Sequence, residues 1–284
     1  MKSKTDYTFL NIIMILIISI GLSYIASKYL PTVTEGFDNL VEAEIQSKKA
    51  ELPIDAVLYI NLDERKDRDQ EISAEMKRIG LPEDKIHRVS AVKRKWGILG
   101  CSLSHIACME FIIQHKWNKV LILEDDAGFE DKDKTRWTKG ITDIKNMIDS
   151  SGVKNTDSTW DVIFLGGFVR DPAGPEKTQY ETIWKTRNTA CTHAYIVRGE
   201  YAPKILDELH YSVQMMMKNP PNHKQYFVDN SLSKLMAVDR WYITIPTLAY
   251  QRESYSDIEG KDANASQPLR GNVVRAWAAG SVLG

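Results

Sequence analysis

Three acidic residues in a row, Glu124, Asp125 and Asp126, directly follow an apolar run at residues 120–123. Adjacent carboxylates repel one another unless a cation or water offsets their charge. In an extended chain Glu124 and Asp126 would face one ion together, while Asp125 would face away. Oxygen ligands suit Mg²⁺ or Mn²⁺, which commonly bridge carboxylates to substrate phosphates. The pattern predicts a divalent-cation site, and a solvated acidic turn is the alternative.

The elements that must position these acids follow from the surrounding pattern. The run at residues 120–123 is short and rich in branched side chains, which is typical of a strand buried on both faces. In open α/β sheets, ligands bind at the carboxyl ends of such strands. Strands and helical patterns alternate along the chain, which predicts an α/β sheet with helices on both faces. The other predicted strands include residues 56–60, 161–165, 190–197 and 241–245.

Two predicted helices precede the acids in the sequence. The first covers about residues 64–79 and has apolar residues on one face. The second opens near residue 100, with Ser102 as the expected N-cap. Residues 168–187 include two prolines and are expected to form a surface loop or lid.

Composition excludes several classes of function. The formal net charge is -1 and no dense Lys/Arg stripe occurs, so a nucleic-acid partner is not expected. The three cysteines, Cys101, Cys108 and Cys191, lack metal-site spacing, and their odd number argues against a disulfide-built scaffold. No G-x-G-x-x-G motif follows the first strand and no P-loop occurs, which argues against the usual dinucleotide and NTPase folds.

The N-terminal residues predict a membrane anchor. Residues 9–26 are almost wholly apolar, and about 18 residues at about 1.5 Å each would cross a bilayer core. No clear cleavage site follows, so we expect an uncleaved single-pass anchor within residues 1–30, spanning about residues 9–27. Lys2 and Lys4 favour a cytosolic N-terminus with a lumenal or extracytoplasmic domain, although Lys28 counters them. We assign residues 31–53 to a stalk, 54–262 to the globular domain and 263–284 to a tail.

Six short motifs occur in a characteristic order along the domain. They are Tyr59-Ile60-Asn61-Leu62 with Arg65 and Arg68, Gly100-Cys101-Ser102-Leu103-Ser104-His105, Leu121-Ile122-Leu123-Glu124-Asp125-Asp126, Ala194-Tyr195-Ile196-Val197, Val228-Asp229 and Ser256-Asp257-Ile258. This order resembles glycosyltransferase family 25, which includes bacterial lipooligosaccharide and animal procollagen galactosyltransferases. The resemblance implies a GT-A-like mixed sheet flanked by helices, a UDP-sugar donor, Mn²⁺ or Mg²⁺, and inversion at the anomeric carbon.

Within this resemblance, residues after the first strand are candidates for holding the donor. Arg65 and Arg68 lie near the top of that strand, where a guanidinium fork can grip phosphate oxygens. Nearby acids could instead pair with both arginines on a charged helix face. Asn61 either lies near the nucleoside or caps the helix.

The acidic run and the second helix supply further candidates. Glu124 and Asp126 are the expected metal and ribose carboxylates, and Asp125 is assigned to the donor site. Ser104 and His105 are expected at a helix N-terminus, where backbone N–H groups favour anions. His105 would then hydrogen-bond the donor sugar or a phosphate, and a histidine bonded to a nearby carbonyl is the alternative.

Inversion requires a base that deprotonates the acceptor hydroxyl, usually Asp or Glu. Asp229 and Asp257 are the candidates that the motifs leave. Asp229 could instead cap a helix, and Asp257 could hold metal or donor. Ser256, beside Asp257, is assigned to donor binding.

The expected reaction moves a hexose, galactose first, from a UDP-sugar to a hydroxyl of a glycan or protein, including a collagen-like acceptor. Two other functions stay open at this point. One is a nucleotide-sugar-binding module without turnover. The other is a metal-dependent phosphoesterase, because acidic clusters at strand ends serve there too.

Overall fold

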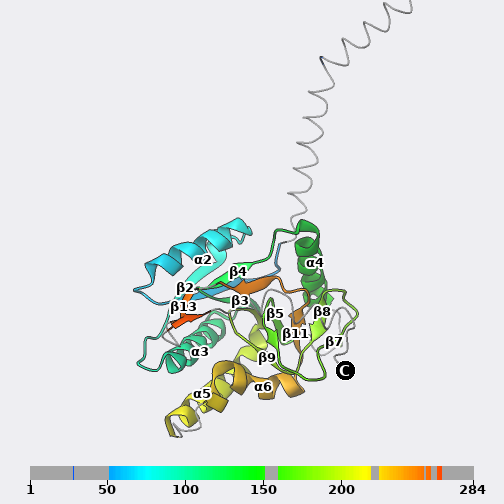
Figure 1. Ribbon diagram of the computed structural model, residues 1–284. Helices are drawn as coiled ribbons and strands as arrows, with labels where there is room; N and C mark the ends of the chain where they lie inside the picture. The colour runs from blue at the N-terminus through cyan, green and yellow to red at the C-terminus, as the bar shows by residue number, and fades with distance from the viewer. Residues whose placement is uncertain are drawn as a thin grey trace, which may run out of the picture. The chain divides into compact units, whose positions relative to one another are not determined.

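The strand that carries the acids, β3 (Lys119–Glu124), lies inside a sheet of eight strands (Figure 1). The computed structural model describes residue 28 and residues 51–150, 159–218, 224–252, 254–256 and 261–263. The sheet has the order β2-β1-β3-β10-β5-β11-β8-β7. Its strands are β1 (Ala56–Asn61), β2 (Ile86–Ser90), β3, β5 (Val162–Phe164), β7 (Glu176–Lys177), β8 (Ile183–Lys185), β10 (Ala194–Arg198) and β11 (Trp241–Thr244).

The sheet is mixed, and its parallel part positions the acids. Strands β1 and β3 run parallel, with Ile60 opposite Glu124, so their carboxyl ends meet at one edge of the sheet. Strand β10 lies antiparallel to β3, with Ala194 opposite Leu123. The start of β10 therefore comes beside the end of β3. The mixed α/β architecture with a helix-flanked sheet confirms the coarse prediction.

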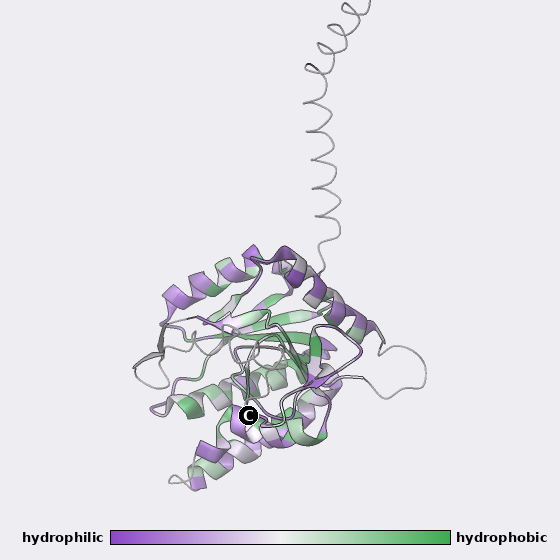
Figure 2. Ribbon diagram, turned by 45° about the vertical axis from the view of Figure 1, so that its right-hand side comes forward, coloured by the Kyte–Doolittle hydropathy of each residue, from purple (hydrophilic) through white to green (hydrophobic). Residues whose placement is uncertain are grey.

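Helices cover both faces of the sheet and bury two separate apolar clusters. One cluster joins the sheet to α3 (Gly97–His115), α5 (Ala202–Lys218) and α6 (Val228–Val238). The other joins it to α2 (Lys66–Arg78) and α4 (Lys134–Ser150). Figure 2 shows the same division, with hydrophobic strands inside and hydrophilic residues on the outward faces of helices. Helices cover both faces of the sheet because the central strands carry apolar side chains on both faces, and each face must be shielded from water.

The remaining elements are short. They are η1 (Glu83–Lys85), η2 (Gly199–Tyr201), β4 (Ala127–Phe129) paired with β12 (Ala249–Gln251), β6 (Phe168–Val169) paired with β9 (Thr189–Ala190), and β13 (Ser254–Ser256) paired with β14 (Lys261–Ala263). The expectation of a plain loop over residues 168–187 is wrong, because β6, β7 and β8 lie within it and the last two extend the main sheet. The pairing of β4 with β12 brings Gln251 beside Ala127, close to the acids.

Helix α3 begins earlier than expected. Its N-cap is Trp96, and Ser102 lies inside the helix with its hydroxyl donating to the carbonyl of Ile98 at 3.1 Å. The prediction of Ser102 as N-cap is therefore wrong. Among the described residues, α3 is also the single helix that is long and apolar enough to cross a membrane. Its residues Ile106, Met109 and Ile112 pack into the core. The predicted anchor at residues 9–27 lies outside the described residues.

A buried carboxylate, Asp161, ties together strand ends at the edge of the sheet opposite the carboxyl end of β3. Its oxygens accept from Nη2 of Arg198 at 2.7 Å and from Nε and Nη2 of Arg240, each at 3.1 Å. Burial raises the pKa of Asp161, but the hydrogen bonds from Arg240 and Arg198 outweigh it, so the pKa lies below its ordinary value. The ionised carboxylate is thus part of the folded structure at neutral pH.

We expect Asp161→Ala to lower the free energy of unfolding by roughly 3–5 kcal/mol at neutral pH, because two arginines lose their buried partner. A carboxylate with a lowered folded pKa stabilises the fold above its unfolded pKa and loses this contribution as the pH falls through the folded value. The difference from wild type should therefore shrink below about pH 4. Urea unfolding at both pH values, with the exposed Asp207→Ala on α5 as control, checks this.

Candidate active site

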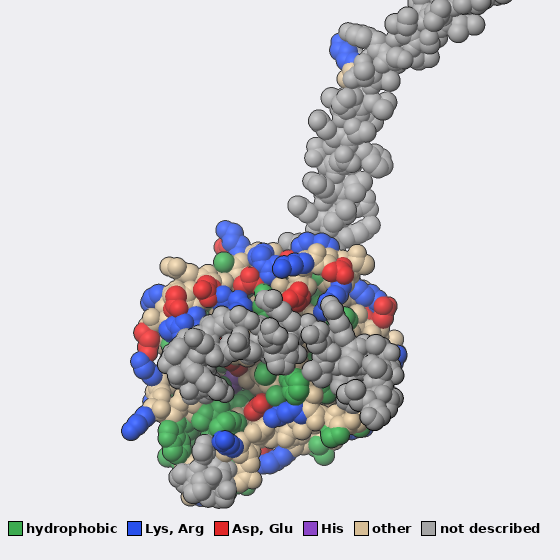
Figure 3. Space-filling view, viewed as in Figure 1, with side chains coloured by type: hydrophobic (Ala, Val, Ile, Leu, Met, Phe, Trp, Pro, Cys, Tyr) green, Lys and Arg blue, Asp and Glu red, His purple; other side chains and the backbone are tan. Residues whose placement is uncertain are grey.

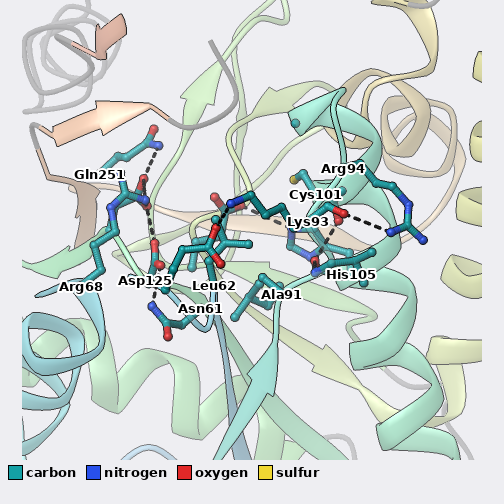
Figure 4. A pocket seen from close by; sticks show the side chains of 18 residues that line it. Asn61, Leu62, Arg68, Ala91, Lys93, Arg94, Cys101, His105, Asp125 and Gln251 are labelled. Atoms are coloured by element: carbon teal, nitrogen blue, oxygen red, sulfur yellow. Dashed lines mark hydrogen bonds and ion pairs between the residues drawn. The ribbon is translucent and has the colours of Figure 1, made fainter. Parts of the chain in front are cut away.

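A cavity of about 220 Å³ opens where the carboxyl ends of β1 and β3 meet (Figure 4). Its walls come from β1, the loop after β2, the first turns of α3, the acidic turn after β3, and Gln251 of β12. The predicted site residues that line it are Asn61, Arg68, Ser104, His105, Glu124, Asp125 and Asp126. On the surrounding face of the molecule, charged side chains of both signs are interspersed (Figure 3).

The three acids do not alternate as an extended chain would. Strand β3 ends at Glu124, and Asp125 and Asp126 form the turn that leads into β4. The expectation that Asp125 faces away is therefore wrong. Its carboxylate accepts from Nδ2 of Asn61 at 2.9 Å and from Nη1 of Arg68 at 2.8 Å. All three acids thus border the cavity.

Glu124 and Asp126 each have one carboxylate oxygen that a neighbouring side chain holds by a hydrogen bond. Oε1 of Glu124 accepts from the hydroxyl of Thr192 at 2.7 Å, and Oδ2 of Asp126 accepts from Nε2 of Gln251 at 2.9 Å. The other oxygen of Asp126, Oδ1, is buried without a hydrogen-bond partner among the described residues. A buried carboxylate oxygen without a partner is costly in a folded protein.

The electrostatics of the pair follow from burial and proximity. Burial and the charge of Glu124 raise the pKa of Asp126 to about 7. Burial also acts to raise the pKa of Glu124, but the hydrogen bond and charge of His105 lower it overall. Near neutral pH Asp126 is therefore partly protonated, while Glu124 is ionised. Oxygen donors with an unsatisfied atom and excess negative charge fit a hard divalent cation such as Mn²⁺ or Mg²⁺.

Arg68 is committed to the acids. It is 7% exposed, and its Nη1 lies 2.8 Å from Asp125 and 3.9 Å from Asp126. Asn61 continues this network, because its Oδ1 accepts from Nη2 of Arg88 at 2.9 Å. Arg68 therefore holds the acidic turn in place in this structure. Arg65, by contrast, does not line the cavity and pairs with Asp67 at 2.7 Å.

Arg68→Met is expected to lower the free energy of unfolding by roughly 3–5 kcal/mol, because Asp125 would stay buried without its cation. Burial raises the pKa of Asp125 and Arg68 opposes that rise, so the variant's Asp125 should titrate still higher. A carboxylate with a raised folded pKa destabilises the fold as the pH rises above its unfolded value, so the loss should be larger at pH ~8 than at pH ~4.

The matched control is Arg65→Met, which removes an ion pair to the exposed Asp67 and should cost much less than Arg68→Met. Urea unfolding at both pH values measures the difference. Equal losses in the two variants would contradict the role given to Arg68.

Ser104 and His105 lie about two turns inside α3, so the expectation that they sit at a helix N-terminus is wrong. The hydroxyl of Ser104 donates to the carbonyl of Gly100 at 2.8 Å and accepts from the backbone N–H of Val92 at 2.9 Å. Gly100 is needed for this close approach, because a Cβ there would lie 2.2 Å from the carbonyl oxygen of Val92. The alternative of a carbonyl partner for His105 also does not hold, since its ring bonds Tyr195 and faces Glu124.

Of the two candidate bases, the structure describes one. Asp229 is the second residue of α6, and no side-chain cap is formed at this helix start, so the capping alternative is not seen. Its carboxylate lies 3.6 Å from Nη1 of Arg170. Asp229 is not among the cavity-lining residues, but its charge, after burial and Glu124, helps raise the pKa of Cys101. Asp257 lies outside the described residues, and only the backbone strand is described at Ser256.

Several cavity residues were missed from the sequence. Thr192 orients Glu124, which lies 68 residues away in the sequence, and Gln251 orients Asp126, which lies 125 residues away. No local sequence pattern marks Thr192 or Gln251. Lys93 and Arg94 bring positive charge to the wall opposite Arg68, as Figure 4 shows. The basic run at residues 93–95 was the available signal for these two.

Comparisons with known proteins place this geometry in context. Residues 95–218, which include α3, the acidic turn and β10, match glycosyltransferase family 25 (LPS biosynthesis protein). No curated protein matches the chain.

Solved structures share a distant likeness with the chain. A glycosyltransferase involved in the glycosylation of the major capsid of PBCV-1 has 11% identity and a TM-score of 0.38, with 66% of this chain and 80% of that one covered. A197 from STIV has 12% identity and a TM-score of 0.38, with 73% and 92% covered. A mannose-1-phosphate geranyltransferase from Thermus thermophilus has 11% identity and a TM-score of 0.34, with 72% and 63% covered. Likenesses at this level carry no argument about the site.

Proposed function

We propose that this chain is a glycosyltransferase of family 25, the family matched over residues 95–218, and that it moves a hexose from a UDP-sugar to a hydroxyl of a glycan or protein acceptor. We take the hexose to be galactose, the domain to be GT-A-like, the reaction to invert the anomeric carbon, and Mn²⁺ or Mg²⁺ to be required. The observation that carries the metal requirement is the buried, unpartnered Oδ1 of Asp126 beside Glu124.

The departure of UDP loads negative charge onto its diphosphate, and a bound divalent cation would neutralise that charge. The chain's own part is to hold the carboxylates that would bind the cation. Thr192 fixes Glu124, Gln251 fixes Asp126, and Arg68 fixes the turn through Asp125. These contacts orient the carboxylates before any ligand arrives, so little reorganisation accompanies binding.

Charge on the opposite wall supports an anionic donor. Lys93 and Arg94 line the cavity on the loop before α3, and Lys93 forms an ion pair with Glu64. A diphosphate between this wall and the acids would meet cationic side chains on one side and the bound cation on the other. Asn61 lines the cavity at the end of β1, and we place the nucleoside on this side of the cavity.

Acceptor activation is assigned to Asp229, with Asp257 as the competing base. A base for this reaction must reach the acceptor hydroxyl on the face opposite the departing UDP. Asp229 comes from α6, which packs against α3, and its charge helps to raise the pKa of the thiols of Cys101 and Cys191. It is therefore close to the cavity but apart from the carboxylates assigned to the cation.

The direct test is a panel of UDP-sugars with Mn²⁺ and no acceptor, in which UDP release is measured before and after EDTA. Metal-dependent release of UDP, fastest with UDP-galactose, is the expected result. Free phosphate in place of UDP would indicate a phosphoesterase. Binding of UDP-sugar without any release would indicate a module without turnover.

We further propose that residues 9–27 anchor the chain in a membrane, with the domain on the lumenal or extracytoplasmic side. The apolar length of that segment supports the anchor. Extraction of the full chain from membranes by detergent but not by alkaline carbonate is the expected result. Protection of the domain from protease in sealed vesicles tests its side.

A further inference from the structure

A second set of potential metal ligands lies in the same cavity, on the side of α3. Cys101 and His105 are four residues apart, so they share one face of the helix. That face meets Glu124 at the end of β3. One ligand atom from each residue, namely Sγ of Cys101, a ring nitrogen of His105 and a carboxylate oxygen of Glu124, lies within 4.8 Å of the other two. Figure 4 shows Cys101 and His105 side by side on the helix, facing the cavity.

The distances resemble those around a tetrahedral metal. Nε2 of His105 lies 3.4 Å from Oε1 of Glu124, which is longer than the usual ~2.9–3.0 Å of an N–H···O hydrogen bond. Two ligands at about 2.0–2.2 Å from a tetrahedral Zn²⁺ are about 3.4 Å apart. Because the Zn–S bond is longer, a thiolate sulfur and a nitrogen or oxygen ligand of the same Zn²⁺ are about 3.6 Å apart. A shift of Sγ of Cys101 by about 1 Å would bring it to that distance from the other two ligand atoms.

Outer contacts already orient two of these ligands. Nδ1 of His105 lies 2.8 Å from the hydroxyl of Tyr195, and His105 is fully buried. The hydroxyl of Thr192 donates to Oε1 of Glu124 at 2.7 Å. If Nδ1–H donates to Tyr195, the lone pair of Nε2 points toward the cavity, as in metal-ligating histidines whose other nitrogen is hydrogen-bonded.

We propose that Cys101, His105 and Glu124 form a Zn²⁺ site whose fourth position opens to the cavity. A thiolate and a carboxylate would balance the charge of the ion, and the thiolate would select Zn²⁺ over Mn²⁺ and Mg²⁺. Glu124 would then be shared between two sites, so zinc would exclude the cation that the donor requires. This competition rests on the proposed function, whereas zinc binding itself does not.

Cobalt titration of the metal-free full chain tests the binding directly, because a thiolate on Co²⁺ gives a charge-transfer band in the near ultraviolet. The band should form in wild type and in Cys108→Ser and Cys191→Ser, and Zn²⁺ should abolish it. It should be absent in Cys101→Ser. A wild-type spectrum without the band, or a band that survives Cys101→Ser, would overturn the site.

Two further variants separate the site from a general effect on folding. Tyr195→Phe keeps all three ligands and removes one outer contact, so it should weaken Zn²⁺ affinity by about 10–100-fold while the cobalt band remains at saturation. His105→Gln should reduce the affinity at least as much. Unchanged affinity in both variants, with folding confirmed by circular dichroism, would contradict the role of His105.

Competition between Zn²⁺ and Mn²⁺ for Glu124 is measured as the inhibition of Mn²⁺-dependent UDP release by zinc. The rate of each variant is compared with its own rate without zinc. Inhibition should be relieved by excess Mn²⁺ in wild type and should require at least about tenfold more zinc in Cys101→Ser. If zinc inhibits both proteins equally, the shared-ligand claim is wrong. If no condition releases UDP, the proposed function fails, and the cobalt spectra still decide the zinc site.

Discussion

Asp126→Asn is expected to remove Mn²⁺-dependent UDP release and at the same time to stabilise the metal-free protein. The loss of activity should be about 10³-fold, because a metal that neutralises the departing diphosphate contributes several kcal/mol and each tenfold is about 1.36 kcal/mol. The amide keeps the shape of the side chain, so its oxygen can still accept from Gln251. Its NH₂ group would replace the oxygen that lacks a partner, and the substitution would remove a negative charge near Glu124.

The gain in stability depends on pH in a defined direction. Burial and Glu124 raise the folded pKa of Asp126 to about 7. Between its unfolded value of about 4 and about 7, the native protein binds more protons than the unfolded chain, so stability falls as the pH rises. The variant should be more stable than wild type by about 1–3 kcal/mol at pH ~8 and similar to it at pH ~4.

Urea unfolding without metal, beside a UDP-release assay with Mn²⁺, measures both parts of this prediction. The exposed Asp84→Asn in η1 is the control and should change neither property. A variant that loses stability together with activity would show that Asp126 supports the fold. Full Mn²⁺-dependent activity in the variant would remove Asp126 from the metal site.

Asp229→Asn is expected to slow transfer to the acceptor by about 10²–10⁴-fold, the usual contribution of a general base. A base acts when it is ionised, so in wild type kcat/KM should fall toward acidic pH. The variant should lack that acidic limb. The pH–rate profile of Asp257→Asn should keep its acidic limb even if the variant is slow. Loss of a residue that binds donor or metal would leave the base in place.

A pH–rate profile of the two variants and wild type decides between the bases. The outcome that contradicts our assignment is an acidic limb that persists in Asp229→Asn and disappears in Asp257→Asn.

The central part of the fold was predictable because its strands carry unambiguous patterns. The run at residues 120–123 is apolar at every position, and all four side chains are fully buried. Helix starts were harder to place. The N-cap of α3 is Trp96, which makes no side-chain capping hydrogen bond, so the sequence signal pointed instead to Ser102. The strands β6, β7 and β8 are two or three residues long, too short for any period to show.

The candidate site was partly predictable for a related reason. Asn61 and the acidic run lie at the ends of strong strand patterns, and the parallel register of β1 and β3 brings them together. The expected direction of Asp125 failed because the strand ends at Glu124, before the two aspartates. Thr192, Tyr195 and Gln251 reach the site through antiparallel pairings that only the folded sheet reveals. The metal-ligand potential of Cys101 was missed because its partners are a helical turn and a strand away.

The most direct measurement is the anomalous signal of manganese in crystals of the protein grown with Mn²⁺ and UDP. We predict one peak in contact with the carboxylates of both Glu124 and Asp126, with diphosphate oxygens on its open side and the uracil toward Asn61. A manganese–UDP complex bound elsewhere, with both carboxylates in contact only with water, would contradict the proposed site.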